Sequence, residues 1–262
     1  MNRFNLISGA AAAALSIITA GCGNRTGSDD LVDAAAASCP IPIENVGFIS
    51  GIELHADTLV YLCSVTSAGV DLPNLGEARE AMKRTMLPSM RSLFADNAAL
   101  MDRVSQKGWV VSVRYTDKAG HRLDLDFPAA EVSAAIDGSA AAVTDPEQRL
   151  ADEIKLANAS LPAPMAPAIM MTSMTDDGKI ITYVCEVDET VADTDAIANI
   201  RSAAPEIRRE MLAALHAAGE PDVERLVEIT GSAGRGIRYL YRGDTTGDTV
   251  SIAFSADEIK RH

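Results

Sequence analysis

Positive charge is scarce in this chain of 262 residues. Lysine and arginine together number 23 against 37 aspartates and glutamates, which gives a net charge of −14 at neutral pH. A protein this acidic is repelled by the phosphates of nucleic acids and by anionic lipid headgroups. We therefore expect no nucleic acid among its partners.

Histidine is also scarce, and its placement speaks against a metal site. None of the four histidines has the spacing of a metal ligand relative to another histidine or a cysteine. They lie far apart in the chain, at His55, His121, His216 and His262. We interpret them as surface or turn residues.

An acidic cluster is the remaining candidate for a cation site. Its members are Glu186, Asp188, Glu189, Asp193 and Asp195. The cluster lacks the alternating ligands and the central glycine of a calcium loop. It also precedes an expected helix, where carboxylates interact favourably with the helix dipole. We predict no metal and no other cofactor, and calcium at this cluster is the alternative.

Catalytic motifs are missing as well. The glycine-rich stretch from Ser232 to Gly236 precedes a strand and opens no helix, so we do not expect it to hold a phosphate. No serine stands in a nucleophile-elbow motif. The sequence therefore predicts no catalytic residue and favours a protein that is not an enzyme. A site assembled from distant residues is the alternative.

Long hydrophobic runs are absent except at the start of the chain. The apolar run from Leu6 to Ala20 follows a basic start at Arg3 and is too short for a comfortable membrane span. Small residues then lead to Cys22. This order is typical of a secretory signal.

The segment from Thr19 to Cys22 resembles the lipobox of bacterial lipoproteins. In that family the cysteine carries the lipid and becomes the first residue of the mature protein. The resemblance implies a signal peptide over residues 1–21, lipidation of Cys22 and attachment to a membrane of the bacterial cell envelope. Gly23 favours the outer membrane. An ordinary signal peptide with an incidental cysteine is the alternative.

Removal of residues 1–21 would remove only Arg3 among the charged residues, which leaves 22 basic and 37 acidic side chains and a net charge of −15. The segment that follows Cys22 is polar and then rich in alanine. We expect residues 22–38 to be a lipidated tether, with a helix over the alanines as the alternative.

The chain contains the same pattern twice. The stretch LVYLCSV (Leu59 to Val65) returns as ITYVCEV (Ile181 to Val187), 122 residues later. Further pairs follow in the same order, at an offset that rises only to 127: KRTML with RREML, DKAGH with DTTGD, and FPAAEV with FSADEI. Matches kept in order indicate two copies of one unit. We place the copies at residues 39–137 and 158–262, with a linker containing a short helix at 138–157.

Periodicity within each copy predicts strand, strand, helix, helix, strand, strand and a short terminal helix. Period-two alternation indicates strands with one buried face. The residues expected to face inward in the first copy are Val46, Phe48, Ile52, Leu54, Leu59, Tyr61, Cys63, Val65, Trp109, Val111, Val113, Tyr115, Leu123, Leu125 and Phe127. Pro88 and Pro205 are expected to kink or split their helices.

These faces predict an α+β fold with two tandem ββααββ units. Each unit would be a four-stranded antiparallel sheet covered on one face by helices. The pattern resembles a group of duplicated lipoproteins of unknown function with this order of strands and helices. That resemblance implies no activity.

Three cysteines remain besides Cys22, an odd number for an oxidising compartment. Cys63 and Cys185 correspond between the copies, whereas Leu161 replaces Cys39. Two states stay open, buried thiols that act as small hydrophobic residues and a Cys39–Cys63 disulfide.

Two functions from different classes remain. The first is a non-enzymatic binding module on a membrane anchor, with a protein or an extended envelope ligand as its partner. The second is a hydrolase that acts on envelope material. For the first function, the candidate surface is the outward sheet face, with Arg114, Arg238 and Arg242.

Overall fold

A computed structural model describes residues 28–43, 46–67, 70–95, 97–137, 145–192, 195–217 and 221–260. The proposed lipidation site, Cys22, lies outside the described residues. The described chain divides into two compact units, and the second unit begins at Asp145. Within the described residues, no helix is both long enough and apolar enough to span a membrane.

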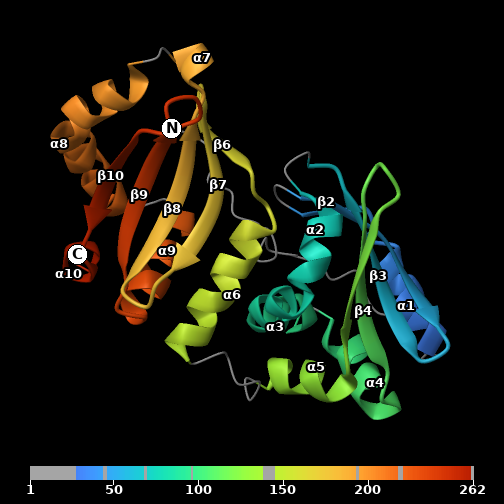
Figure 1. Ribbon diagram of the computed structural model, residues 1–262. Helices are drawn as coiled ribbons and strands as arrows, with labels where there is room; N and C mark the ends of the chain where they lie inside the picture. Colours follow the sequence, from blue (N-terminus) through green and yellow to red (C-terminus); the bar gives the residue numbers. More distant parts are fainter. Residues whose placement is uncertain are drawn as a thin grey trace. The chain divides into compact units, whose positions relative to one another are not determined.

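The first unit contains one mixed sheet (Figure 1). Its strands lie in the order β1-β2-β3-β4-β5; β3 and β4 are parallel, and the other neighbours are antiparallel. The elements are α1 (Ser28–Ala36), β1 (Ile41–Ile43), β2 (Gly47–His55), β3 (Thr58–Val65), α2 (Leu72–Glu77), α3 (Arg79–Ala95), α4 (Ala98–Lys107), β4 (Val110–Thr116), β5 (Arg122–Phe127) and α5 (Ala129–Ile136).

The second unit has the same order of elements. Its strands lie in the order β6-β7-β8-β9-β10, and the parallel neighbours are β8 and β9. The elements are α6 (Pro146–Asn158), β6 (Ala163–Ala166), β7 (Ile169–Asp176), β8 (Ile180–Val187), α7 (Glu189–Ala192), α8 (Ala196–Leu215), α9 (Pro221–Ser232), β9 (Gly236–Gly243), β10 (Thr249–Phe254) and α10 (Ala256–Ile259).

The α+β class is confirmed, but the expected four-stranded antiparallel sheet is wrong. Each sheet has a fifth strand, β1 or β6, which is short and contains a proline. Each also has a parallel pair, because the chain passes through helices between β3 and β4 and between β8 and β9 before it returns to the sheet. Parallel neighbours need such a crossover, whereas antiparallel neighbours can be joined by a hairpin.

The predicted core positions of the central strands are confirmed. Tyr61 and Cys63 on β3, and Tyr183 and Cys185 on β8, are all at most 3% exposed. The inward residues of β4 and β5 are also buried, from Trp109 to Phe127 in alternation.

One predicted core position is wrong, Phe48 on β2. The register shifts between Ile49 and Gly51, so Ile49 and Ile52 face the core while Phe48 lies on the other face. A bulge adds one residue to one strand and reverses the alternation beyond it. The second unit has the same irregularity between Met171 and Ser173 on β7.

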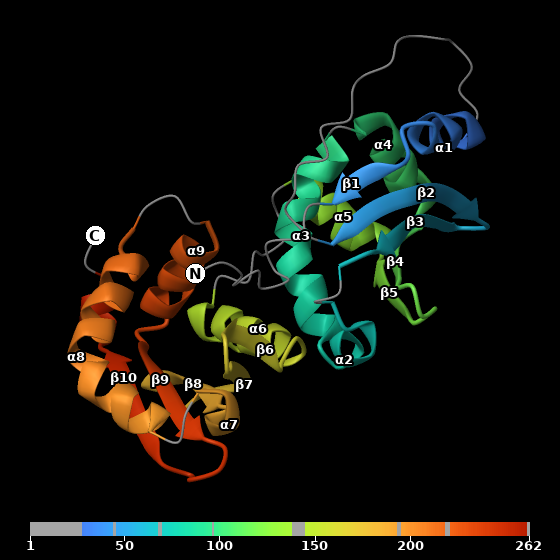
Figure 2. The same ribbon diagram turned by 90° about the horizontal axis from the view of Figure 1, so that it is seen from above.

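Helices cover the core face of the second sheet. Residues of α6, α8, α9 and α10 pack in one hydrophobic cluster with Tyr183 and Phe254. In Figure 2, α6, α8 and α9 lie on one side of strands β7 to β10. The other face, which we call the outward face, carries the residues that alternate with these core positions.

Packed helices lie in the expected tether, where a helix was the alternative, and in the expected linker, where a short helix was predicted. In the expected tether, α1 contacts β2 and buries Val32 and Ala35. In the expected linker, α6 packs against β7 and α9 and buries Leu150 and Leu156. Burial of these side chains provides the free energy that orders such alanine-rich helices.

Neither proline splits its helix into two. The helix α3 runs through Pro88, and α8 runs through Pro205. The cap at the start of α8 is Asp195, whose side chain makes no capping hydrogen bond.

Candidate functional site

The three arginines of the candidate surface lie on central strands. Arg114 is on β4, and Arg238 and Arg242 are on β9. Each alternates with buried neighbours such as Tyr115 or Tyr239, so each lies on the outward face of its sheet. The two sheets belong to different units, and each outward face is considered by itself.

On the first sheet, Arg114 is held by an acidic neighbour. Its Nε donates to Asp124 Oδ1 at 3.0 Å, and Arg122 Nε donates to both carboxylate oxygens of Asp124 at 2.8 and 2.9 Å. Burial alone would raise the pKa of Asp124, but these arginine hydrogen bonds outweigh burial and lower it. This face therefore carries a neutralised charge cluster.

The centre of the first outward face is inaccessible in this structure. Val60 on β3 is 1% exposed and Ser112 on β4 is 3% exposed, although both alternate with core positions. The residues at the same register positions of the second sheet, Thr182 and Arg238, are only half-buried. The second outward face is thus the more accessible of the two.

On the second sheet, Arg238 is incompletely paired. Its Nη2 lies 3.4 Å from Asp177 Oδ2, while its Nε is buried and has no hydrogen-bond partner among the described atoms. Asp177 belongs to the β7–β8 turn, where its Oδ1 accepts the backbone N–H groups of Lys179 and Ile180. These backbone bonds are the main cause of the lowered pKa of Asp177.

Arg242 is exposed and stands beside Glu186 in the register of β8 and β9. The rest of this face is small and mostly uncharged: Thr182, Val184, Leu240, Thr249, Ser251 and Ala253. Two arginines and one glutamate on a sheet surface that is otherwise uncharged suit a ligand that offers hydrogen-bond acceptors or negative charge to the arginines.

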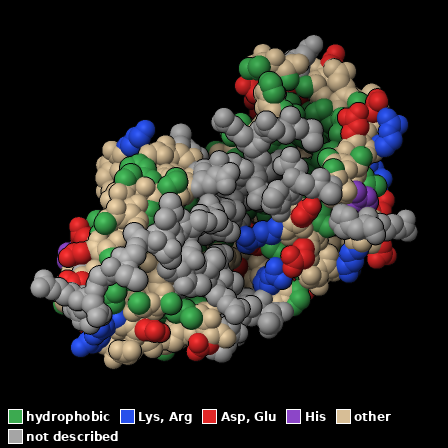
Figure 3. Space-filling view, turned by 180° about the vertical axis from the view of Figure 1, so that it is seen from behind, with side chains coloured by type: hydrophobic (Ala, Val, Ile, Leu, Met, Phe, Trp, Pro, Cys, Tyr) green, Lys and Arg blue, Asp and Glu red, His purple; other side chains and the backbone are tan. Residues whose placement is uncertain are grey.

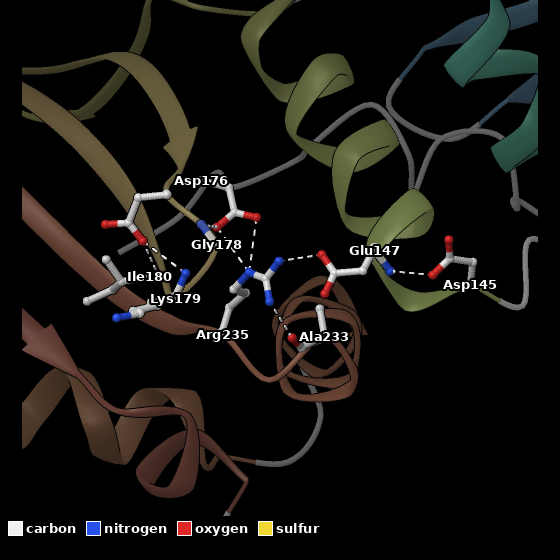
Figure 4. Close-up of polar contacts among 9 residues, drawn as sticks. Asp145, Glu147, Asp176, Gly178, Lys179, Ile180, Ala233 and Arg235 are labelled. Atoms are coloured by element: carbon white, nitrogen blue, oxygen red, sulfur yellow. Dashed lines mark hydrogen bonds and ion pairs between the residues drawn. The ribbon is translucent and has the colours of Figure 1, made fainter.

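The glycine-rich stretch that we rejected as a phosphate loop has a structural role instead (Figure 4). Arg235 Nε lies 3.1 Å from both carboxylate oxygens of Asp176, its Nη1 donates to Ala233 O at 2.8 Å, and its Nη2 donates to Glu147. Burial alone would lower the pKa of Arg235, but its acidic partners outweigh burial and raise it. The side chain, only 12% exposed, ties α6 to the β7–β8 turn.

Sequence reasoning missed this Arg235 cluster. Glu147 and Arg235 are 88 positions apart, and only the packing of α6 brings them together. The one local signal is Gly234, whose φ of +68° forms the turn that presents Arg235.

The acidic cluster between residues 186 and 195 is largely satisfied by protein groups. Glu189 is 3% exposed and accepts hydrogen bonds from Thr245 N, Thr246 N and Thr246 Oγ1 at 2.8 to 3.1 Å. Asp188 accepts from the start of α7. Asp193 lies outside the described residues. Over the described ranges, no three acidic, histidine or cysteine side chains meet as a metal site.

The described histidines do not converge. His55 and His121 are exposed and lie 2.8 Å from Glu53 and Asp117 respectively. His216 Nε2 lies 2.8 Å from the carbonyl oxygen of Glu258. His262 lies outside the described residues.

Cys39, Cys63 and Cys185 are free thiols. Burial raises the pKa of both Cys63 and Cys185 to about 12, which makes them poor nucleophiles at neutral pH. Of the two states left open by the sequence, this structure has the thiols and not the Cys39–Cys63 disulfide.

Basic and acidic side chains are mixed on the face of the molecule that Figure 3 shows. In Figure 3, basic side chains lie beside acidic ones, and no broad basic patch covers the described part of this face.

Comparison with known proteins adds little. No protein-family model matches the chain, and no curated protein matches it significantly. Among solved structures, it is similar to a "putative secreted protein" from Pseudomonas aeruginosa at 14% identity and a TM-score of 0.35. The match covers 44% of this chain and 94% of the other.

Proposed function

We propose that this protein is a non-enzymatic binding module that a lipid on Cys22 holds at a membrane of the bacterial cell envelope. The outward face of the second sheet carries the proposal. The described helices that pack on that sheet lie on its core face, while the outward face has exposed positions and holds one exposed and one incompletely paired arginine. The hydrolase alternative has no specific observation in its favour among the described residues.

We also infer that the two units are copies of one ancestral unit. They share element order, strand order, the position of the parallel pair and the bulge in their second strand. A three-residue contact supports the same inference. In the first unit Lys83 lies 5.4 Å from the Phe127 ring centre and 3.6 Å from Glu131.

The second unit has Arg208 in the same relation to Phe254, at 5.1 Å, and to Glu258. These are the positions that the sequence pairs KRTML with RREML and FPAAEV with FSADEI bring together. A cation held over an aromatic ring and bound by the next helix is a specific arrangement. Its recurrence at matching positions favours duplication over coincidence.

The partner of the second outward face is a protein or an extended envelope ligand. An open sheet offers a broad and shallow surface, which suits an extended ligand better than a small molecule. A ligand acceptor can reach the exposed part of the Arg238 guanidinium, whose side chain is 36% exposed and whose bond to Asp177 is long at 3.4 Å. A charge-assisted hydrogen bond from this group would contribute binding energy.

The test is charge reversal on this face. The Arg238→Glu, Arg242→Glu double variant should stay within roughly 1 kcal/mol of the wild-type stability, because exposed strand positions contribute little. It should lose the partner that the anchored wild type captures from native envelopes by cross-linking. An Arg149→Glu, Arg209→Glu variant changes charge equally on α6 and α8 and should keep that partner. Equal capture by both variants would refute this surface.

The anchor has its own test. Cys22→Ala removes the proposed lipid attachment, so the protein should leave the membrane fraction and become soluble. Wild-type protein treated in parallel is the control. If the variant still sediments with membranes after a high-salt wash, the lipidation of Cys22 is refuted, whatever the outcome for Arg238.

A further inference from the structure

The two sheets end in edge strands that differ in protection. At the β10 edge, Arg201 Nη2 donates to Thr249 O at 3.1 Å, and Arg208 Nε donates to Ala253 O at 3.1 Å. Both arginines come from α8. They occupy backbone acceptors that would otherwise be free to pair with another strand.

The helices α2 and α3 contact β5, but no described side chain bonds its outward backbone groups as the arginines of α8 do at β10. Asp117 N donates to His121 O, which makes these two residues a hydrogen-bonded pair of the β4–β5 hairpin. Hydrogen-bonded pairs alternate along antiparallel strands, so the backbone groups of Arg122, Asp124 and Asp126 point away from β4. No described residue donates to or accepts from these outward backbone groups. In Figure 2, β5 is the outermost strand of its sheet.

We propose that β5 is the interface of a homodimer, in which the β5 strands of two copies pair antiparallel about a two-fold axis. The outward residues fix the register. Asp124 lies opposite Asp124 of the second copy, and Arg122 lies opposite Asp126 of the second copy. All three residues then exchange both backbone hydrogen bonds, and the two sheets join into one.

Charge complementarity singles out a second copy as the occupant. Arg122 and Asp126 are both exposed, and in this register each arginine faces an aspartate directly, twice per dimer. Opposite charges at directly facing positions stabilise a strand pair.

The two central aspartates face each other, but each carboxylate is already bound by Arg114 and Arg122. Four arginines then surround four aspartates, and the seam is neutral despite the acidic chain. An unrelated extended peptide would match this order of charges only by accident.

The proposal goes beyond the binding function above and does not depend on it. Dimerisation uses the edge of the first sheet, whereas the proposed partner uses the face of the second. Loss of the dimer with partner binding intact, or the reverse, therefore separates the two proposals.

The test uses the full chain with Cys22→Ala, so that detergent micelles do not hold copies together, and sedimentation equilibrium over a range of concentrations. We expect a monomer–dimer equilibrium. Arg122→Asp and Asp126→Arg each place like charges opposite one another at two sites, so each should raise the dissociation constant at least about tenfold. The Arg122→Asp, Asp126→Arg double variant restores opposite charges and should restore the dimer.

Mixing the two single variants gives a sharper result. A heterodimer of Arg122→Asp with Asp126→Arg again has opposite charges at both sites, so the mixture should dimerise although neither component does alone. Ser251→Asp, on the protected β10 edge, is the control and should leave the equilibrium unchanged. Circular dichroism checks that each variant is folded.

A wild type that stays monomeric throughout would overturn the proposal. A dimer that the single variants do not weaken, or that is not recovered by the double variant and the mixture, would overturn it equally. So would a dimer lost in Ser251→Asp, because that result would assign the contact to the other edge.

Discussion

Glu258→Gln should weaken the second unit in a way that depends on pH. Glu258 lies in α10, where its Oε2 accepts Ser255 N at 2.9 Å and its Oε1 accepts Arg208 Nη2 at 2.5 Å. The hydrogen bond from the Ser255 backbone, followed by the one from Arg208, lowers the pKa of Glu258 from 4.5 to about 2. Glutamine keeps one oxygen that can accept from Ser255 N, but an NH2 group replaces the oxygen that accepts from Arg208. The substitution therefore removes the charge and the Arg208 bond together.

The size of the effect follows from that shift. If the carboxylate were fully shielded, a pKa lowered from 4.5 to about 2 would correspond to about 3 kcal/mol of stability. The side chain is 32% exposed, so water screens the ion pair, and we expect about 1 kcal/mol. The unfolded chain takes up the proton at higher pH than the folded chain does. The contribution is therefore complete above 4.5 and is lost as the pH falls from 4.5 to about 2.

Urea unfolding at neutral pH measures the full contribution of the Glu258 charge to stability, and unfolding near pH 2 measures what remains as the carboxylate takes up its proton. Wild type and Glu258→Gln should differ by about 1 kcal/mol at neutral pH and should converge in acid. Glu131→Gln is the matched control, because Glu131 lies 3.6 Å from Lys83 and follows a proline cap that makes no side-chain hydrogen bond. It should cost at most about 0.5 kcal/mol. A difference for Glu258→Gln that persists unchanged in acid would refute the electrostatic origin.

Gly47→Ala should destabilise the first unit by at least about 3 kcal/mol in the same assay, because its Cβ would lie 1.9 Å from Ser64 O. Gly51→Ala on the same strand meets only a side-chain carbon at 3.6 Å and should cost no more than about 1 kcal/mol; equal losses would contradict the close approach. Glu189→Ala should cost about 3 kcal/mol, since it removes a buried carboxylate that accepts hydrogen bonds from Thr245 N and Thr246 N. Exposed Glu186→Ala should be neutral within about 0.5 kcal/mol, and a comparable loss there would show that general charge, not the buried contact, is responsible.

The sequence predicts the buried face of a strand well where apolar residues recur at every second position. Trp109, Val111, Val113 and Tyr115 alternate with less apolar residues, and the structure buries all four. The same logic fails at Phe48, because a bulge between Ile49 and Gly51 shifts the alternation by one residue. Phe48 and Ile49 are both apolar, so the sequence does not show which of them faces the core.

Strand partnership is harder to predict than strand existence. The helices between β3 and β4 were expected, yet the two strands were expected to be antiparallel. Alternation gives the face of a strand but not its direction relative to a neighbour, and only the crossover through α2, α3 and α4 carries that information. The fifth strands escaped notice because β1 and β6 are too short to show a period.

The candidate site was predictable only in its strand positions. Arg114, Arg238 and Arg242 do lie on outward faces, but pairing decides how available each one is. Arg114 is held by Asp124 across one hairpin, a contact that the register implies. The pairing of Arg238 is with Asp177, 61 positions away, and its strength is set by how far the guanidinium reaches into the β7–β8 turn. Such distances depend on packing and not on spacing along the chain.

The two proposals together give the duplication a physical use. The two units have matching cores but differ at their surfaces: in our proposals the first has a self-complementary edge at β5, and the second has a binding face around Arg238 and an edge whose acceptors are bound by Arg201 and Arg208. A dimer through β5 uses no residue of either second-sheet face. One membrane-bound assembly would then hold two identical sites and two lipid anchors. Linked sites raise the effective concentration of an extended ligand at its second contact, so a weak single site would suffice for stable capture.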